Sequence, residues 1–101
     1  MKEIKLWLDD LRPSPEGWVW VKTTREAMQI IINGGVLIIS LDHDLGPVKE
    51  TGGDVLRWLE EQVFAKGFWG PMIEIHTMNP VARSWMLKVA RKINARIAGE
   101  I

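Results

Sequence analysis

Residues that can transfer protons or bind metal ions stand at the ends of three short apolar segments of this chain. The segments end at Leu8, at Leu41 and at His76 itself. Both histidines and four of the 13 acidic residues of the chain stand at these ends. If the segments are parallel strands, their carboxyl ends lie at one edge of a sheet, where ligands bind. The residues expected at this edge are Asp9, Asp10, Asp42, His43, Asp44, His76, Thr77 and Asn79.

Four carboxylates at one edge repel each other and need a compensating group. At an effective dielectric constant near 20, two charges about 6 Å apart cost about 3 kcal/mol. A divalent cation, for example Mg²⁺, would bind the carboxylates and keep waters for a phosphate. A neighbouring arginine, or protonation of one carboxylate, would also compensate. The candidate metal ligands are Asp9, Asp10, Asp42 and Asp44, and the candidate arginines are Arg12 and Arg83.

His43 and His76 are candidate catalytic residues, together with Asp42 and Asp10. Two imidazoles suit acid–base chemistry near neutral pH, because one can remove a proton from water while the other protonates a leaving oxygen. Opening a cyclic phosphate needs these two roles. Successive strand residues point to opposite sides, however, so His43 opposes Asp42 and Asp44 unless the backbone turns there. A purely structural role is the alternative for each histidine.

The dipeptide Asn79-Pro80 predicts the start of a helix, with Asn as N-cap and Pro at the first helical position. The free N–H groups of a helix N-terminus attract anions, so this start would bracket a phosphate together with His76 and Thr77. An ordinary N-cap is the alternative. Gly52-Gly53 matches no phosphate-loop spacing and is predicted to be a flexible loop. The phosphate-binding candidates are Arg12, Thr77, Asn79 and Arg83.

Four strands and three helices must position these residues. Apolar runs predict the strands, and capping residues with helically spaced apolar residues predict the helices. Thr23 and Glu26 form a capping-box pattern, and Gly34-Gly35 and Gly67 are stop signals. The predicted strands are Ile4–Leu8, Trp18–Lys22, Val36–Leu41 and Met72–His76, and the predicted helices are the segment after Thr23, Asp54–Lys66 and Pro80 to about Arg96.

The order of elements, β-β-α-β-α-β-α, indicates an α/β protein. Strands that alternate with helices predict a mostly parallel, four-stranded sheet with helices on both faces, which is a small three-layer fold. The link between the first two strands contains Pro13 and Pro15 and no helix. About eight extended residues reach roughly 26 Å, more than the roughly 17 Å of a strand, so a parallel return fits. We expect this return rather than a hairpin, which would break the right-handed β-α-β pattern.

Length and composition favour a single small domain, 1–101. The chain has 101 residues and no cysteine, which excludes disulfides and thiolate metal sites. Its 47% hydrophobic and 26% charged residues exclude wholesale disorder, and its apolar runs are too short to cross a membrane. Met1 to Glu3 lead into a strand rather than a hydrophobic signal core, so we expect a cytoplasmic protein.

Charge and tryptophan are unevenly distributed. Residues 81–101 carry five Lys or Arg and one Glu. The basic last helix is therefore either a solvated face or a weak contact for nucleic acid. Of the six tryptophans, Trp18 and Trp20 share one face of their strand, and Trp69 is expected to be exposed in a loop. Most tryptophans are expected in the core, and one beside the cleft would stack a nucleobase.

Four segments of the chain resemble the receiver domains of response regulators, and more closely the cyclic-phosphate processing receiver domain. The pattern is an acidic pair after the first strand, an Asp after the third strand and a Thr after the fourth. The segments span nearly the whole chain and read LWLDDLRP (6–13), SLDHDLG (40–46), Thr51 with Gly53-Asp54, and HTMNP (76–80).

This resemblance implies a compact receiver-like (flavodoxin-like) fold and the processing of cyclic phosphates on RNA ends or nucleotides. In receivers the acidic pair and the third-strand Asp hold Mg²⁺, and that Asp, here Asp42, accepts a phosphoryl group. The pattern departs from ordinary receivers because the helix between the first two strands and the fifth strand with its lysine are missing. These departures argue against phosphoryl signalling, and the nearby histidines favour hydrolysis.

Three functions stay open at this point. The first is a phosphoesterase for a cyclic-phosphate nucleotide or RNA end, with two histidines as acid and base and an acidic cluster that orders the site or holds a divalent metal. The second is a phosphorylatable or metal-binding regulatory module of the receiver type. The third is a binding domain for a nucleotide or a protein, without turnover.

Overall fold

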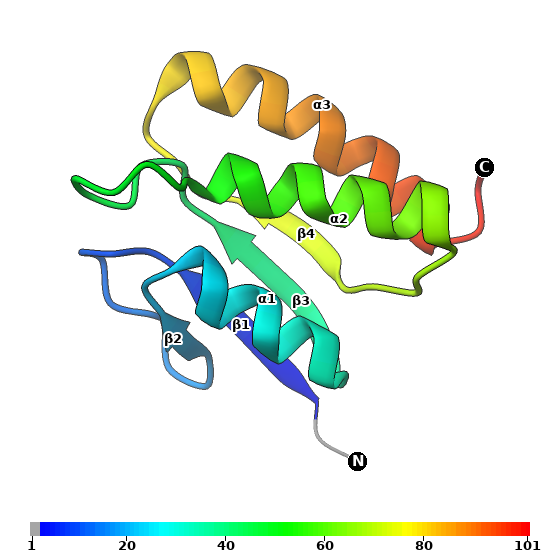
Figure 1. The fold of residues 1–101 in the computed structure, drawn as a ribbon, viewed down its shortest axis with the longest axis horizontal. Coiled ribbons are helices and arrows are strands. Elements are labelled where there is room, and N and C mark those ends of the chain that lie inside the picture. Colours follow the sequence, from blue (N-terminus) through cyan, green and yellow to red (C-terminus); the bar gives the residue numbers. More distant parts are fainter. Residues whose placement is uncertain (1–2) are drawn as a thin grey trace.

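A computed structural model describes residues 3–101 as an α/β fold (Figure 1). Met1 and Lys2, at the start of the segment in which no secretion signal is expected, lie outside the described residues. The elements are β1 (Ile4–Leu8), β2 (Val19–Val21), α1 (Thr24–Asn33), β3 (Val36–Leu41), α2 (Gly52–Lys66), β4 (Met72–Ile75) and α3 (Pro80–Ile97). Their order and type confirm the predicted α/β class.

The sheet has the strand order β2-β1-β3-β4, and all three neighbouring pairs are parallel. The proline-containing link from β1 to β2 is the expected extended return, since Leu6 pairs with Val19 in parallel register. β3 lies between β1 and β4, with Trp7 opposite Ser40 and Ser40 opposite Glu74. This order brings the ends of β1, β3 and β4 side by side.

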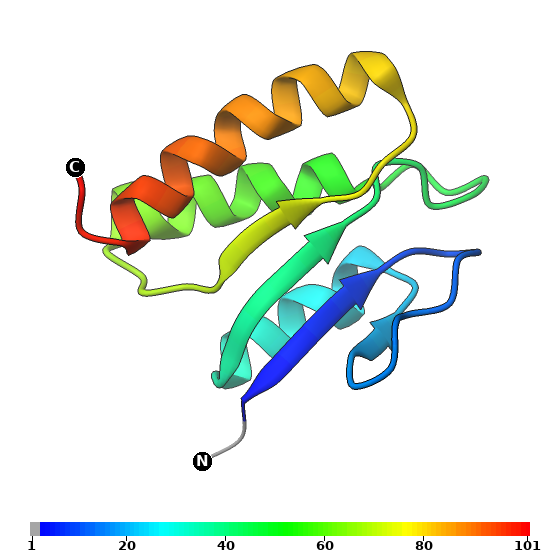
Figure 2. The ribbon, with the colours of Figure 1, turned by 180° about the vertical axis from the view of Figure 1, so that it is seen from behind.

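α1 and α2 lie on one face of the sheet and α3 runs along the outer edge of β4, which corrects the expectation of helices on both faces. Figure 2, drawn from behind, shows the strands in front of α1 and α2, with α3 beside β4. The cause is the strand order. The crossovers β2–α1–β3 and β3–α2–β4 run in the same direction across the sheet, and right-handed connections then put both helices on the same side. The link from β1 to β2 runs the other way and contains no helix.

Alternation along the strands therefore gives the sheet a covered face and an open face. The covered face is made of buried apolar residues that pack against the helices: Leu6, Leu8, Val21, Ile39, Leu41, Ile73 and Ile75. Strand register places the alternate residues on the open face: Lys5, Trp7, Trp20, Ile38, Ser40, Met72 and Glu74. Of these, Lys5, Trp20, Met72 and Glu74 are exposed.

Gly52-Gly53 begins α2 and is not the flexible loop that we predicted. Thr51 is the N-cap, and its capping box with Asp54 is complete. Gly52 packs so closely against the end of β3 that an added Cβ would lie 1.5 Å from the Asp42 carbonyl oxygen. Gly52 therefore lets the helix start directly against the strand end, and Gly53 leaves room for the Trp85 ring, which would lie 2.8 Å from a Cβ there.

The outer edge of β4 is closed by side chains of α3. The Asn94 amide accepts a hydrogen bond from Ile73 N–H at 2.8 Å and donates one to the Ile73 carbonyl at 2.9 Å. Arg83 Nη1 donates to the Ile75 carbonyl at 3.2 Å. Trp69 is 73% exposed, as expected. Among the described residues, every helix is too short or too polar to span a bilayer.

Candidate functional site

A cleft of about 440 Å³ lies at the carboxyl ends of β1, β3 and β4. This is the sheet edge at which the sequence predicts the polar residues to meet. The loops after the three strands form its walls. Its lining residues are Asp9, Asp10, Leu11, Arg12, Asp42, Asp44, Gly46, Thr77, Met78 and Asn79.

Asp9 is the most enclosed acidic group of this cleft, with 2% of its surface exposed. Its Oδ1 accepts the backbone N–H groups of Leu11 (2.9 Å) and Arg12 (2.7 Å), and its Oδ2 lies 3.0 Å from His76 Nε2. Burial alone would raise the pKa of Asp9. The hydrogen bonds from Arg12, Leu11 and His76 outweigh burial, so the net pKa is lowered. Asp9 is therefore an ionised carboxylate at neutral pH.

His76 is held by groups from β1, from the residue directly after it and from β3. Its ring stacks on Trp7, with centroids 3.7 Å apart and planes within 3° of parallel. Its Nδ1 lies 2.7 Å from Ser40 Oγ, which in turn lies 3.1 Å from Glu74 Oε1. Burial lowers the pKa of His76, and the neighbouring Asp9 carboxylate only partly offsets this. His76 is therefore mainly neutral at pH 7.

The Ser40 hydroxyl has one proton and lies near two acceptors, His76 Nδ1 and Glu74 Oε1. When His76 is neutral and donates Nε2–H to Asp9, Ser40 donates to Nδ1. When His76 is protonated, Nδ1–H donates to Ser40, whose proton then turns to Glu74. Asp9, His76, Ser40 and Glu74 thus lie in hydrogen-bonding distance of one another in that order, and Ser40 donates to Glu74 only when His76 is protonated.

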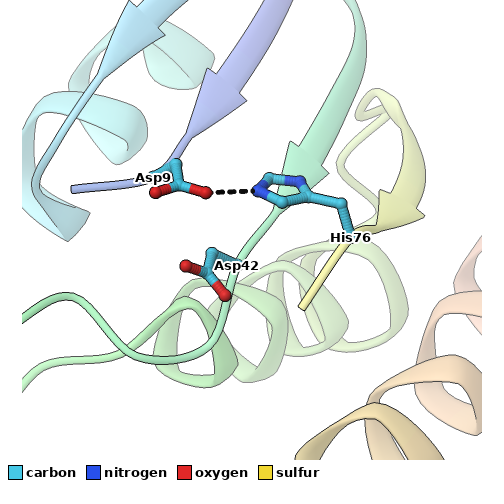
Figure 3. A group of neighbouring side chains, drawn as sticks. All are labelled: Asp9, Asp42 and His76. Carbon is cyan, nitrogen blue, oxygen red and sulfur yellow. Dashed lines mark hydrogen bonds and ion pairs between the residues drawn. The ribbon is translucent and has the colours of Figure 1, made fainter. Parts of the chain in front are cut away.

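Asp42 lies opposite the Asp9–His76 pair (Figure 3). One oxygen or nitrogen atom from each of Asp9, Asp42 and His76 falls within 4.8 Å of the others. Burial raises the pKa of Asp42, and the charge of Asp9 raises it further, against the opposing His43 N–H bond at 2.8 Å. The two aspartates therefore have pKa values displaced in opposite directions, an arrangement that separates a proton-transfer group from a permanently charged one.

The donor set of Asp9, Asp42 and His76 fits a divalent cation. Carboxylate oxygens suit Mg²⁺ and Mn²⁺, and an imidazole nitrogen suits Mn²⁺ less than Zn²⁺ or another late transition metal. The predicted ligands Asp10 and Asp44 line the same cleft but stand outside this group. His76 takes the place that the sequence analysis gave to a further carboxylate.

Neither histidine lines the cleft itself, but His76 contacts Asp9 in its wall, whereas His43 turns away from it. The His43 ring meets Trp85 of α3 edge-on, with centroids 6.4 Å apart, and its Nδ1 lies 3.0 Å from the Asp44 carboxylate. The cause is the alternation noted from the sequence: Asp42 points to the open-face side and His43 to the helix side. The geometry therefore offers one histidine at the cleft rather than an acid–base pair of histidines.

Three of the four phosphate-binding candidates, Arg12, Thr77 and Asn79, line the cleft. Asn79 is the N-cap of α3, and its side chain accepts the Ala82 N–H at 3.1 Å. The N-terminus of an 18-residue helix thus starts at the cleft. Arg83 lies elsewhere, because its guanidinium turns to the edge of β4.

Trp7, Ser40 and Glu74 contribute to the site and were not among the predicted site residues. The sequence contains a clue to the role of Ser40, because it is the single polar residue in the apolar run Val36–Leu41. A hydroxyl in a fully buried strand must find a partner. Which partner it finds depends on the strand order, and only the fold gives that.

A parallel sheet with acidic residues at its carboxyl edge and a Thr after β4 defines a receiver-like domain. The chain belongs to the family of the cyclic-phosphate processing receiver domain, whose family model matches residues 4–92. The resemblance stated from the sequence is thereby confirmed, and the name of the family links it to cyclic-phosphate processing. A search of curated proteins and a search of solved structures each gave no match.

Proposed function

We propose that this protein is a phosphoesterase that opens cyclic phosphates of nucleotides or RNA ends. The observation that carries the proposal is the convergence of Asp9, Asp42 and His76 within 4.8 Å at the cleft. The family name, which refers to cyclic-phosphate processing, supports the substrate class.

The substrate phosphate lies at the N-terminus of α3, where the free backbone N–H groups favour an anion. Thr77 and Asn79 line the cleft beside this helix start, and Arg12, in the loop after β1, lines it as well. The positive charge of Arg12 is needed because every other charged residue that lines the cleft is acidic. These groups orient the phosphorus atom toward the carboxylates.

Asp42 is the proton-transfer group, because its raised pKa brings it closer to neutrality than an ordinary carboxylate. It accepts a proton from water as the water oxygen forms a bond to phosphorus. The bond from phosphorus to one ribose oxygen breaks, and that oxygen receives the proton from Asp42. The products are a phosphate monoester and a free hydroxyl, so one water molecule is consumed.

Asp9 and His76 act as a unit beside Asp42. Ionised Asp9 disfavours a second negative charge on Asp42 and so keeps the pKa of Asp42 raised. His76 fixes Asp9 through the 3.0 Å hydrogen bond. A divalent cation held by Asp9, Asp42 and His76 would add Lewis-acid polarisation of a phosphoryl oxygen.

The test is hydrolysis of adenosine 2′,3′-cyclic monophosphate, followed by ³¹P NMR, with Mg²⁺, Mn²⁺, Zn²⁺ or a chelator present. We expect Asp42→Asn and His76→Ala each to lower kcat by about 10²- to 10⁴-fold. His43→Ala and Glu61→Gln, the latter on the exposed side of α2, serve as controls that keep the rate. Ligand recovered intact under all four conditions, or equal turnover by Asp42→Asn and the unchanged protein, would reject the proposal.

Phosphoryl acceptance by Asp42 is a second candidate function, favoured by one observation. Thr77 lines the cleft together with Asp42 and is itself 1% exposed, so its hydroxyl can hold an added phosphoryl group. Incubation with acetyl phosphate and Mg²⁺ would then add the mass of one phosphoryl group, and Asp42→Asn would abolish the adduct. Absence of any adduct excludes this function.

A further inference from the structure

The open face of the sheet is continuous with the cleft. Along each strand, alternation places Asp9 on the side of Lys5 and Trp7, and His76 on the side of Met72 and Glu74. Contacts support this placement, since His76 stacks on Trp7. A molecule that extends out of the cleft on this side meets the open face next.

The open face carries fixed aromatic rings beside the cleft. Trp20 is 36% exposed, and its Nε1 donates to the Asp9 carbonyl at 2.7 Å, which holds the ring next to the site. Trp18 packs edge-on against Trp7, with ring centroids 6.0 Å apart. Exposed, immobilised tryptophan rings on a sheet are platforms on which nucleobases stack.

Cationic side chains flank these rings on both sides. Lys5 Nζ lies 6.0 Å from the Trp18 ring centroid, and Lys22 Nζ lies 4.6 Å from that of Trp20. At the other side, a hollow of about 420 Å³ joins β4 to α3 and is lined by Arg83 and Arg91 as well as Glu74. Of these five charged side chains four are cationic, so the flanks of the face match a polyanion.

The charges of the open face and its flanks favour a nucleic acid over a second copy of this chain as the partner. A second copy stacked face to face would bring four more cations onto the same surface, with only one further carboxylate, Glu74. A strand of nucleic acid supplies both phosphates for the lysines and arginines and bases for the tryptophans. The lysines now above the rings would move to the phosphates, because an exposed cation–π contact is weak.

From these observations we infer that the open face binds single-stranded RNA, whose 3′-terminal cyclic phosphate occupies the cleft. The inference rests on the proposed function for the identity of the terminal group. In four-stranded RNA-binding sheets, aromatic side chains on the exposed face stack two or three bases. The preferred substrate is then an oligonucleotide end rather than a mononucleotide, and the face reads its single-stranded form through stacking and charge.

Binding is measured by fluorescence anisotropy with 5′-labelled tetrauridylate in two forms, one ending in a 2′,3′-cyclic phosphate and one in a 3′-hydroxyl. We expect Trp20→Ala and Lys22→Glu each to weaken binding of both forms by about 5- to 100-fold. Lys22→Glu should also flatten the dependence of log Kd on log salt concentration. Circular dichroism melting confirms that each variant is folded.

Matched controls are Trp69→Ala, an exposed ring near the strand starts and therefore far from the cleft, and Lys88→Glu, a cation of α3 that does not line the hollow beside β4. Both controls should bind within twofold of the unchanged protein. A larger loss with Lys88→Glu than with Lys22→Glu would move the contact to the last helix and overturn the inference.

The outcomes separate this inference from the proposed function. Binding of the 3′-hydroxyl form without hydrolysis of the cyclic form supports the RNA-binding face and rejects the phosphoesterase. Hydrolysis of the mononucleotide without measurable binding of either oligonucleotide does the reverse. A concentration-dependent dimer in sedimentation that Met72→Glu dissociates assigns the face to a second copy, and also overturns the inference.

Discussion

The covered face and the open face belong to the same four strands, yet their side chains have different tasks. The covered face consists of aliphatic residues that are at most 6% exposed. The open face mixes aromatic, charged and hydroxyl side chains, and it continues into Asp9, Asp42 and His76. Stability is therefore concentrated on one side of the sheet, and polar chemistry on the other.

This separation depends on pairing the polar groups of the open face with each other. Ser40 is fully buried although no helix covers it, because Trp7, Glu74 and His76 surround its hydroxyl. Among residues 3–101, no buried side-chain nitrogen or oxygen lacks a hydrogen-bond partner. A sheet with one helical layer can thus hold a polar site without exposing unsatisfied groups.

Truncation of one side chain on each face gives the largest predicted contrast. Leu41→Ala removes a fully buried residue of the covered face and should lower the free energy of unfolding by about 2–5 kcal/mol. Met72→Ala, on the open face, should change it by less than about 1 kcal/mol. Urea denaturation measures both. Equal losses would show that a further chain or segment covers the open face in solution.

Ser40→Ala tests whether the open face holds its own buried polar network. The variant leaves His76 Nδ1 without its partner and should cost about 1–3 kcal/mol in urea denaturation. Glu74→Gln is the control, since its amide oxygen still accepts from Ser40 and its loss should be smaller. If Ser40→Ala is as stable as the unchanged protein, the hydrogen bonds from Asp9 to Glu74 do not operate as described.

Asp42→Asn should make the protein more stable while it removes the proposed phosphoesterase activity. Burial and the charge of Asp9 oppose ionisation of Asp42, so a neutral isostere relieves both. Single stabilising substitutions commonly add about 0.5–2 kcal/mol to the free energy of unfolding. Thermal and urea denaturation at pH 7 check the sign, and a destabilised variant would contradict the placement of Asp42 beside Asp9.

The smallest expected effect is on the pH dependence of stability. The folded-state pKa of His76 is lowered by burial, so the unfolded chain binds a proton first, near its ordinary pKa of about 6.5. Stability is complete above that pH and falls as the pH drops through the window below it. His76→Gln should lose less stability than the unchanged protein between pH 7.5 and pH 5.5, and parallel curves would contradict burial of the ring.

Asp9 also makes stability depend on pH, at lower pH than His76 does. As with His76, stability is lost when the pH falls. The folded-state pKa of Asp9 is lowered by the hydrogen bonds from Arg12, Leu11 and His76, which exceed the opposing effect of burial. The stabilisation is present above the unfolded pKa of about 3.9 and is lost as the pH falls through the folded pKa. Asp9→Asn should therefore remove part of the acid-induced loss of stability that urea titrations record below pH 4.

The sequence predicted the strands, the parallel return and the sheet edge because these depend on local pattern. Asp9, Asp42 and His76 meet because each directly follows a strand. Strand alternation predicted that the side chains of His43 and Asp42 point to opposite sides of the sheet. In the structure the His43 ring contacts Trp85. Local sequence pattern could not predict that the open face lacks a helical layer. That property depends on the strand order β2-β1-β3-β4 and on the handedness of the crossovers. Gly52 is helical because of the tight approach to Asp42, a long-range contact.

Asn94 has a consequence for the behaviour of this domain in a crowded solution. An unpaired strand edge recruits foreign strands and seeds fibrillar assembly. A single amide of α3 occupies both the donor and the acceptor of Ile73 and so imitates one residue of a neighbouring strand. The sheet is thereby terminated at β4, and molecules at high concentration do not polymerise through this edge.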